Sequence, residues 1–197
     1  MRYWLSLEVY RDGSRRLKGL FAPVMSARMY FLDFYVYPPL IILCLIVAFK
    51  AVAAGKLPEM LALVIFGYLM WTLVEYLAHR YVFHHIAGFR GLHEAHHAEP
   101  NELIGSPTIF SLAIFYCLAY WPIASIWGVR PAAAFLAGLL TGYLSYVLVH
   151  YAVHHFGSHG FRLMKKLKRQ HALHHHVSQQ RYFGVTTSFW DKVFGTN

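Results

Sequence analysis

Four stretches of almost continuous apolar residues alternate with polar segments along the chain, at residues 34–54, 58–78, 107–128 and 132–150. A helix needs about 20 apolar residues to cross the hydrocarbon core of a bilayer, and each stretch has that length or close to it. Prolines mark three of the starts, and Pro107 is itself the first residue of the third stretch. Pro58 stands in the first turn of the second stretch, where its missing N–H leaves no hydrogen bond unmade, and Pro131 directly precedes the fourth. The pattern predicts four transmembrane helices.

The polar segments between the stretches indicate how these helices connect. Residues 55–57 and 129–131 are very short connections, so the first and second helices, and the third and fourth, should form two antiparallel hairpins. Four crossings place both termini and the long polar loop on one side of the membrane. We therefore expect an all-α integral membrane bundle of four transmembrane helices in one domain, residues 1–197. Its parts are an interfacial N-terminal segment (1–33), a transmembrane region (34–152) containing a histidine loop (79–106), and a histidine-rich helical cap (153–197).

The distribution of charge predicts the orientation of the bundle. The chain is 57% hydrophobic and only 14% charged, whereas soluble proteins carry about 25% charged residues. Its net charge of +9 comes mainly from the N-terminal segment, the histidine loop and the tail beyond residue 161, while the two short connections hold little besides Lys56 and Arg130. Because basic loops remain in the cytoplasm, we expect both termini and the histidines on that side, near anionic lipid head groups. This distribution argues against nucleic-acid binding.

Two further features bear on processing and redox chemistry. The first thirty residues are scattered with charge and lack the apolar core of a cleavable signal peptide. Cys44 and Cys117 both fall within apolar stretches, so they are expected to be small buried hydrophobic residues and not a disulfide or a metal pair.

The 14 histidines are all confined to the chain beyond residue 78. Twelve of them form four groups: His79 with His84; His93 with His96 and His97; His150 with His154 and His155; and His171 with His174, His175 and His176. Residues four apart share a helix face, so His93 with His97, and His150 with His154, are able to face one ion. A zinc site needs about four ligands, and here at least ten imidazoles are available. The surplus predicts two metal ions of a kind that imidazole binds, such as iron, zinc or copper.

Other residues near these groups have different expected roles. A site built of neutral imidazoles leaves the charge of the metals uncompensated, so nearby carboxylates should matter. Glu75 lies one helical turn before His79, and we expect its carboxylate to accept a hydrogen bond from the His79 ring, with pairing to Arg80 as the alternative. The histidines left over, His85, His155, His159 and His176, are expected to be flanking or surface residues.

A different reaction class is also compatible with one of these groups. His93, Glu94 and His97 satisfy the H-E-x-x-H pattern of zinc proteases, in which the glutamate is the general base. Such a membrane zinc protease would need one further ligand and would leave the other histidine groups without a role. It is kept as the alternative from outside oxygenase chemistry.

From residue 75 to the C-terminus the chain resembles the fatty acid hydroxylase/sterol desaturase superfamily of membrane di-iron oxygenases, and most of all its fatty acid 2-hydroxylases. The resemblance rests on the histidine groups, on residues 183–196 (FGVTTSFWDKVFGT) and on Trp190-Asp191 within them. It implies ten ligands and no catalytic residue beyond them. One metal would take His79, His84, His93, His97 and His174, and the other would take His96, His150, His154, His171 and His175. Glu75 and Asp191 are the carboxylates expected to support these ligands.

The resemblance also implies the reaction. We expect two iron ions, which zinc can replace in isolated protein, to use O2 and external electrons to hydroxylate a lipid acyl chain at C2. The substrate would be a fatty acid or the N-acyl chain of a sphingolipid, and a sterol or carotenoid hydroxylase or desaturase is the alternative within the superfamily. The electrons are expected from a separate partner, either a ferredoxin or a b-type cytochrome with its reductase. That partner would dock on the basic residues 162–169, and attraction to the membrane surface is the alternative role of this basic run.

Overall fold

The computed structural model describes residues 24–157 and 161–197, and its regular structure within these ranges is helical apart from one isolated bridge between Val24 and Ile104. Four helices in these ranges are long and apolar enough to cross a membrane: Ala27–Phe49, Ala54–Phe83, Thr108–Trp127 and Val129–His155. The expected all-α bundle with four membrane-spanning helices is confirmed. Residues 1–23, which hold most of the predicted N-terminal segment, and His159 lie outside the described residues.

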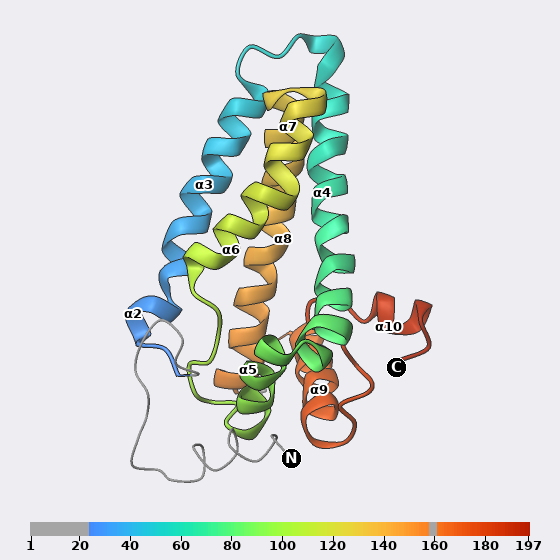
Figure 1. Ribbon diagram of the computed structural model, residues 1–197. Coiled ribbons are helices and arrows are strands. Elements are labelled where there is room, and N and C mark those ends of the chain that lie inside the picture. The colour runs from blue at the N-terminus through green and yellow to red at the C-terminus, as the bar shows by residue number, and fades with distance from the viewer. Residues whose placement is uncertain (1–23, 158–160) are drawn as a thin grey trace.

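Each long helix is assembled from consecutive elements. The first comprises α2 (Ala27–Tyr30) and α3 (Leu32–Phe49), and the second comprises η1 (Ala54–Lys56), α4 (Leu57–Leu77) and η2 (Ala78–Phe83). The third is built from α6 (Thr108–Ile114), η3 (Phe115–Tyr120) and α7 (Trp121–Trp127), and the fourth is α8 (Val129–His155). Three shorter helices, α5 (Ala87–Ala98), α9 (Arg162–His176) and α10 (Phe189–Val193), gather at the end of the bundle opposite the two tight turns (Figure 1).

The boundaries of the first two spans differ from the expectation. The first helix ends at Phe49 because the chain turns at Ala51, whose φ of 53° is incompatible with a right-handed helix. The second runs on to Phe83 instead of ending near residue 78, because the π-helical η2 continues α4 without a break. This extension carries the first histidines within the helix itself.

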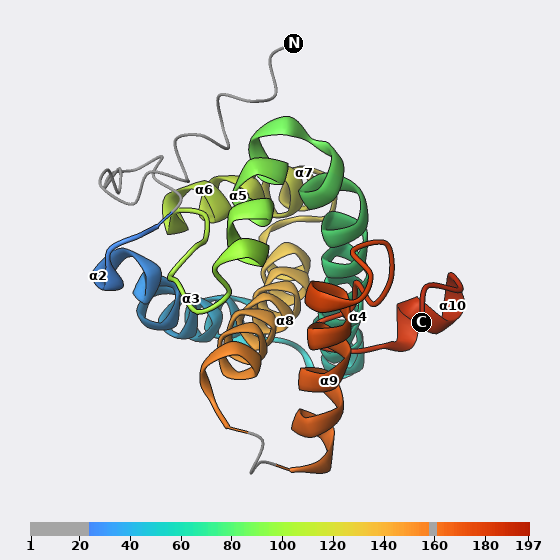
Figure 2. The same cartoon turned by 90° about the horizontal axis from the view of Figure 1, so that it is seen from below.

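Helix α8 lies at the centre of the bundle, with α3 and α4 packed against it (Figure 2). The crossing of α4 and α8 is close because glycines face each other's backbone. A Cβ on Gly138 would lie 1.9 Å from the Val64 carbonyl oxygen, and one on Gly67 would lie 2.1 Å from the Phe135 carbonyl oxygen. Small residues allow such close contact between membrane helices, where dispersion and not water exclusion drives association.

Aromatic rings fill the space beside this crossing. The Tyr143 ring centroid lies 4.7 Å from that of Tyr37, 5.1 Å from that of Trp71 and 5.2 Å from that of Phe115. These rings come from all four long helices, so their edge-to-face contacts tie the whole bundle together.

The two cysteines have different environments. Cys44 is buried, as expected, but the expectation that Cys117 is buried is wrong, because its side chain is exposed on η3. The third span is the least enclosed of the four, so most of its apolar residues face outward, where lipid surrounds a membrane protein. Hydropathy alone does not distinguish that lipid-facing side from the core.

Candidate metal centre

The π-helical turn η2 places the first two histidines. In an α-helix, residues five apart point about 140° away from each other around the axis. The π-helix closes its hydrogen bonds over five residues, so His79 and His84 lie nearly one above the other. Their rings are stacked, with centroids 5.4 Å apart and an angle of 15° between the planes. A π-turn inside a longer helix is frequent at functional sites.

The other three histidine groups lie on regular α-helices that meet η2 at the same end of the bundle. His93, His96 and His97 lie on α5, His150 and His154 on the last turns of α8, and His171, His174 and His175 on α9. All ten predicted ligands are therefore brought into one cluster. Within this cluster, all of them except His175 divide into two groups.

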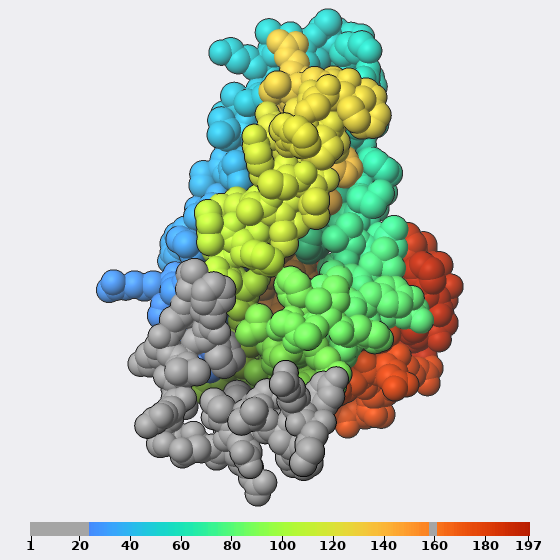
Figure 3. Space-filling view, viewed as in Figure 1, coloured from blue at the N-terminus to red at the C-terminus, as the bar shows by residue number. Residues whose placement is uncertain are grey.

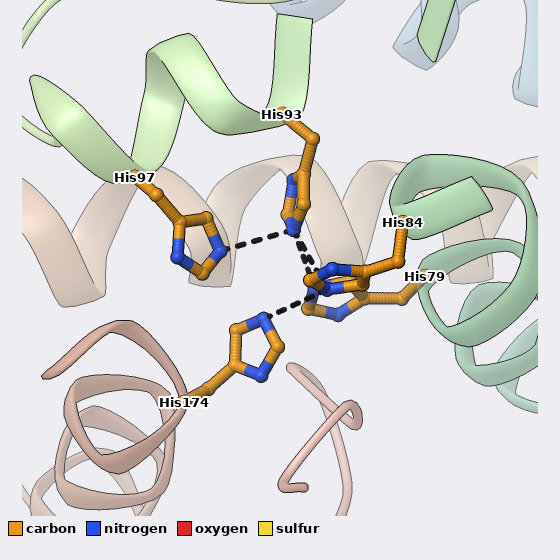
Figure 4. A group of neighbouring side chains, drawn as sticks. All are labelled: His79, His84, His93, His97 and His174. Carbon is orange, nitrogen blue, oxygen red and sulfur yellow. Dashed lines mark hydrogen bonds between the residues drawn. The ribbon is translucent and has the colours of Figure 1, made fainter. Parts of the chain in front are cut away.

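The first group comprises His79, His84, His93, His97 and His174, with one ligand nitrogen from each within 4.8 Å of all the others. The Nε2 of His93 lies 3.1 Å from that of His79, 3.1 Å from that of His84 and 3.0 Å from that of His97. The Nε2 of His174 lies 3.2 Å from that of His84. Figure 4 shows the five rings converging from η2, α5 and α9. This is the set that the resemblance assigned to one metal.

The second group comprises His96, His150, His154 and His171. The Nε2 atoms of His96 and His150 are 3.1 Å apart, and those of His154 and His171 are 2.7 Å apart. His175, the fifth expected ligand of this metal, lies outside the group. Its ring is instead stacked on that of His97 at 4.0 Å, and neither of its buried ring nitrogens has a hydrogen-bond partner among the described residues.

Two rings of the first group have a defined tautomer. The Nδ1 of His79 lies 2.6 Å from the carbonyl oxygen of Phe183, and the Nδ1 of His174 lies 2.7 Å from that of Arg181. Because a carbonyl oxygen only accepts, each Nδ1 must carry the proton and donate. The Nε2 of each ring is then an unprotonated lone pair directed into the group. Converging lone pairs of this kind fit a cation.

Burial among other imidazoles favours the neutral, metal-binding form of the rings. Loss of solvent, followed by the nearby His174, lowers the pKa of His84 to about 4. Burial together with His154 lowers the pKa of His96 to about 3, and burial together with His175 lowers that of His97 to about 2. At neutral pH these rings are uncharged, and a set of neutral imidazole donors suits iron, zinc or copper.

Glu75 does not touch the His79 ring, so the expected contact is wrong. Its carboxylate instead accepts hydrogen bonds from the backbone N–H groups of Val185 and Thr186 and from the Thr186 hydroxyl, at 2.6–2.8 Å. The His79 ring N–H that we expected to donate to Glu75 donates to the carbonyl oxygen of Phe183 instead. Arg80 donates to the Tyr76 hydroxyl, so the alternative pairing with Glu75 is wrong as well.

The remaining predicted residues lie at the edge of the cluster. Glu94 is half-exposed and accepts a 2.7 Å hydrogen bond from Arg90. His85 and His176 are exposed, and His155 is stacked on Tyr151 with ring centroids 4.2 Å apart. None of these histidines belongs to either of the two groups.

A cavity of about 190 Å³ extends from the bundle core to the histidines. Trp71 and Phe89 contribute to its mainly apolar wall, and His93 and His150 lie where it reaches the metal centre. Asp33 also faces the cavity, with its carboxylate accepting hydrogen bonds from Thr108 and Tyr143. A hollow is visible between α5 and α6 in this part of the molecule (Figure 3). An apolar cavity that ends at a metal centre suits a lipid chain.

A second, more polar hollow of about 460 Å³ borders the same centre. Arg80, Arg90, Gln179 and Gln180 line it, together with three histidines of the first group. His93 belongs to the walls of both hollows. The centre is thus reached from an apolar side and from a polar side.

The comparison with known protein families decides the identity. The sequence profile described as "Fatty acid hydroxylase" matches residues 64–196, which include every histidine of the two groups. The chain belongs to the fatty acid hydroxylase family. It is therefore a lipid-modifying oxidoreductase of the metal-dependent hydroxylase class, as the resemblance implied.

Individual relatives agree with this assignment. The Arabidopsis thaliana proteins "Dihydroceramide fatty acyl 2-hydroxylase FAH2" and "FAH1" are 34% and 31% identical, over 79% and 94% of this chain and 68% and 81% of their own. The Saccharomyces cerevisiae "Ceramide very long chain fatty acid hydroxylase SCS7" is 34% identical over 95% of this chain, which spans half of that protein. The solved structure titled "Full length scs7p (only hydroxylase domain visible)" matches with a TM-score of 0.74 and 30% identity, over 85% of this chain and 66% of that one.

Sequence reasoning missed three parts of this site. The carbonyl groups of Phe183 and Arg181 carry no signal in the sequence, because every residue has one. Asp33 did carry a signal: it is an acidic residue beside an apolar span, where an ionisable group is costly unless it is partnered or functional.

Proposed function

We propose that this protein hydroxylates a lipid acyl chain at C2, with the N-acyl chain of a sphingolipid as the foremost substrate. The observation that carries the proposal is the meeting of an apolar cavity with two groups of converging histidines at the end of a membrane bundle. The plant and yeast relatives are named as hydroxylases of dihydroceramide or ceramide acyl chains, and these names support the substrate class.

We further propose that the two groups hold two iron ions. The first group offers five imidazoles and the second offers four, with His175 close enough to be recruited by a small ring movement, since its ring centroid lies 4.5 Å from that of His171. When bound, an iron pair supplies the reduction of O2 and the oxidising power needed to replace a C–H bond by C–OH.

The protein's own contribution is orientation and exclusion of water. Trp71 and Phe89 line an apolar path that holds the acyl chain in line with His93 and His150. An acyl chain aligned in this way keeps the same carbon next to the centre, so the reaction does not depend on a random collision in the right geometry. Asp33 and the Tyr143 hydroxyl lie on the same wall and offer polar contacts for the part of the lipid that is not hydrocarbon.

Electrons would arrive from the polar side of the centre. The hollow that Arg80, Arg90 and Gln180 line opens onto His84, His93 and His97 and carries positive charge. A separate electron-transfer protein, a ferredoxin or a b-type cytochrome, would reach the metals over the shortest path there, with the basic residues 162–169 of α9 adding attraction for an acidic partner. If the basic segments remain in the cytoplasm, the histidines and both termini would lie on that side as well.

Two alternatives are less well supported. A sterol or carotenoid is a bulky ring system or a long rigid polyene, whereas the relatives are named as acyl hydroxylases. In the protease alternative Glu94 would have to be free to act as a base, but its carboxylate is engaged by Arg90 at the surface.

Lipid mass spectrometry tests the proposal. A host that expresses the protein with an electron donor should accumulate sphingolipids or fatty acids carrying one extra oxygen, located at C2 by fragmentation. A His150→Ala variant, expressed at the same level, should show no gain. Extra oxygen only in sterols or carotenoids, or no gain with the metals and donor present, would contradict the proposed substrate class.

A further inference from the structure

The segment that follows α9 supplies the carbonyl groups that orient two metal ligands. Phe183 accepts from the Nδ1–H of His79, and Arg181 accepts from the Nδ1–H of His174, at 2.6 and 2.7 Å. Both rings belong to the first group. The Nδ1 atoms of His96 and His171 in the second group, and that of His97 in the first, are buried with no partner among the described residues. The segment at residues 181–186, which we name the carbonyl strap, therefore acts on one group only.

Two buried carboxylates hold the carbonyl strap in place. Asp191 accepts the backbone N–H groups of Phe183 and Gly184 at 2.8 and 2.9 Å, and Glu75 accepts those of Val185 and Thr186 at 2.7 and 2.8 Å. Four consecutive N–H groups are thus bound by two side chains. One of these side chains comes from the membrane-spanning helix α4, and the other lies beyond the strap on α10.

The surroundings leave the carbonyl strap little freedom to move. A Cβ on Gly184 would lie 2.0 Å from the Thr187 carbonyl oxygen and 2.8 Å from the Asp191 carboxylate. The Thr196 hydroxyl donates to Asp191 at 2.8 Å and lies 2.9 Å from the Tyr76 hydroxyl of α4. Asp191 is therefore fixed from two directions, and the strap with it.

We propose that Glu75 and Asp191 are positioning residues for the metal of the first group. They act through the carbonyl strap, which fixes the tautomer and the ring orientation of His79 and His174. The inference rests on the proposed two-metal centre. Hydrogen bonds to the outer nitrogen of a ligating histidine typically change metal affinity or activity by about 10- to 100-fold when they are removed.

The test measures binding of cobalt(II) alone to metal-free, detergent-solubilised protein, followed by visible absorption. The wild type should bind two ions. Glu75→Leu, which removes every acceptor on this side of the carbonyl strap, should weaken one of the two sites by about 10- to 100-fold and leave the other unchanged. Glu75→Gln keeps one carbonyl oxygen for the two N–H groups and should restore most of the affinity. Glu59→Leu, on the same helix but paired with Lys56 at the surface, is the matched control and should match the wild type.

Ligand variants identify which site has changed. In a His154→Ala background, which disables the second group, Glu75→Leu should weaken the remaining site. In a His84→Ala background, which disables the first group, Glu75→Leu should change nothing further. If Glu75→Leu fails to fold, Asp191→Asn provides a second test. Its amide is unable to accept from both Phe183 and Gly184, so it should weaken cobalt binding at the same site.

The outcomes distinguish a failure of the positioning role from a failure of the proposed two-metal centre. Equal weakening of both sites, or two unchanged sites in folded Glu75→Leu, overturns the positioning role while the two-metal centre stands. A wild type that binds fewer than two cobalt ions contradicts the proposed centre itself.

Discussion

Each ligand of the centre must present an unprotonated ring nitrogen, and the surrounding residues decide which nitrogen that is. His79 and His174 donate from Nδ1 to backbone carbonyls, which leaves Nε2 free for a cation. Burial lowers the pKa of His84, His96 and His97 far enough that the rings are neutral at physiological pH. The centre is therefore able to bind a metal without first expelling protons from these three rings.

Two adjacent histidines on α8 provide a direct test of the ligand assignment. His154 belongs to the second group, while His155 is stacked on Tyr151 outside it. His154→Ala should lower the metal content by about one ion per chain and reduce product formation by at least about 100-fold. His155→Ala should keep both metals and most of the activity. Metal analysis of the two purified variants checks this, and equal losses in both would contradict the assignment.

Glu94 separates hydroxylase from protease chemistry. Because its carboxylate pairs with Arg90 in solvent, Glu94→Gln should keep both metals and most of the hydroxylation activity. A zinc protease would lose nearly all turnover, since its general base would be gone. The measurement is the rate of product formation beside a peptide-cleavage assay. Peptide cleavage by the wild type that disappears in Glu94→Gln would contradict the hydroxylase account.

At the scale of elements, the centre depends on how α4 and α8 approach each other. Helix α4 continues into η2, which carries His79, and α8 carries His150 and His154 near its own end, so the crossing helps to bring the two groups together. The glycine contacts at Gly67 and Gly138 bring the helices as close as their backbones allow. The π-helical turn η2 then rotates His84 toward the ligands on α5.

Gly138→Ala should destabilise the bundle. The added Cβ would lie 1.9 Å from the Val64 carbonyl oxygen and 2.8 Å from the Tyr68 nitrogen, so α4 and α8 would have to separate. Overpacking of this kind costs about 1–3 kcal/mol, and thermal unfolding in detergent should show the loss. Gly91→Ala on α5 is the control, since nothing lies within 4 Å of its added Cβ. A Gly138→Ala protein as stable as the wild type would show that the crossing tolerates a wider spacing.

The sequence predicted the features that depend on neighbouring residues and missed those that depend on residues far apart in the chain or on backbone hydrogen bonding. Hydropathy and length predicted the four spans, and the histidine pattern singled out residues that the structure brings together, because both are local patterns. The partners of Glu75 are the backbone N–H groups of Val185 and Thr186 and the Thr186 hydroxyl, which lie far along the chain, so neither spacing nor hydropathy marked them. The π-turn at η2 was likewise invisible, since hydropathy does not encode backbone hydrogen-bond register.

At the scale of the whole molecule, the centre lies between two different environments. The apolar cavity reaches it from the membrane bundle, and the polar hollow reaches it from the side of Arg80 and Arg90. A hydroxylase of lipid chains needs an approach for its apolar substrate, and in our proposal the polar hollow admits the electrons from a separate partner. The shared histidine, His93, lies where the two meet.

Orientation in the membrane is the first prediction at this scale. With the basic segments in the cytoplasm, Lys56→Cys in the short connection should react with a membrane-impermeant maleimide added to intact cells. Asn197→Cys at the other end should react only after the cells are opened. Replacement of Cys44 and Cys117 by Ser removes background labelling in both proteins. Labelling of Asn197→Cys in intact cells would show that this end of the bundle, with its histidines, faces the outside of the cell, which would contradict the predicted orientation.

The most direct test of the central claim follows the origin of the added oxygen. Protein reconstituted in lipid vesicles with iron, a reducing partner and a ceramide should be given heavy-isotope oxygen gas in ordinary water. The account predicts one heavy oxygen atom per product, at C2 of the N-acyl chain, and no product from the His150→Ala variant. Oxygen that derives from water, or a product that has lost two hydrogens without gaining oxygen, would contradict it.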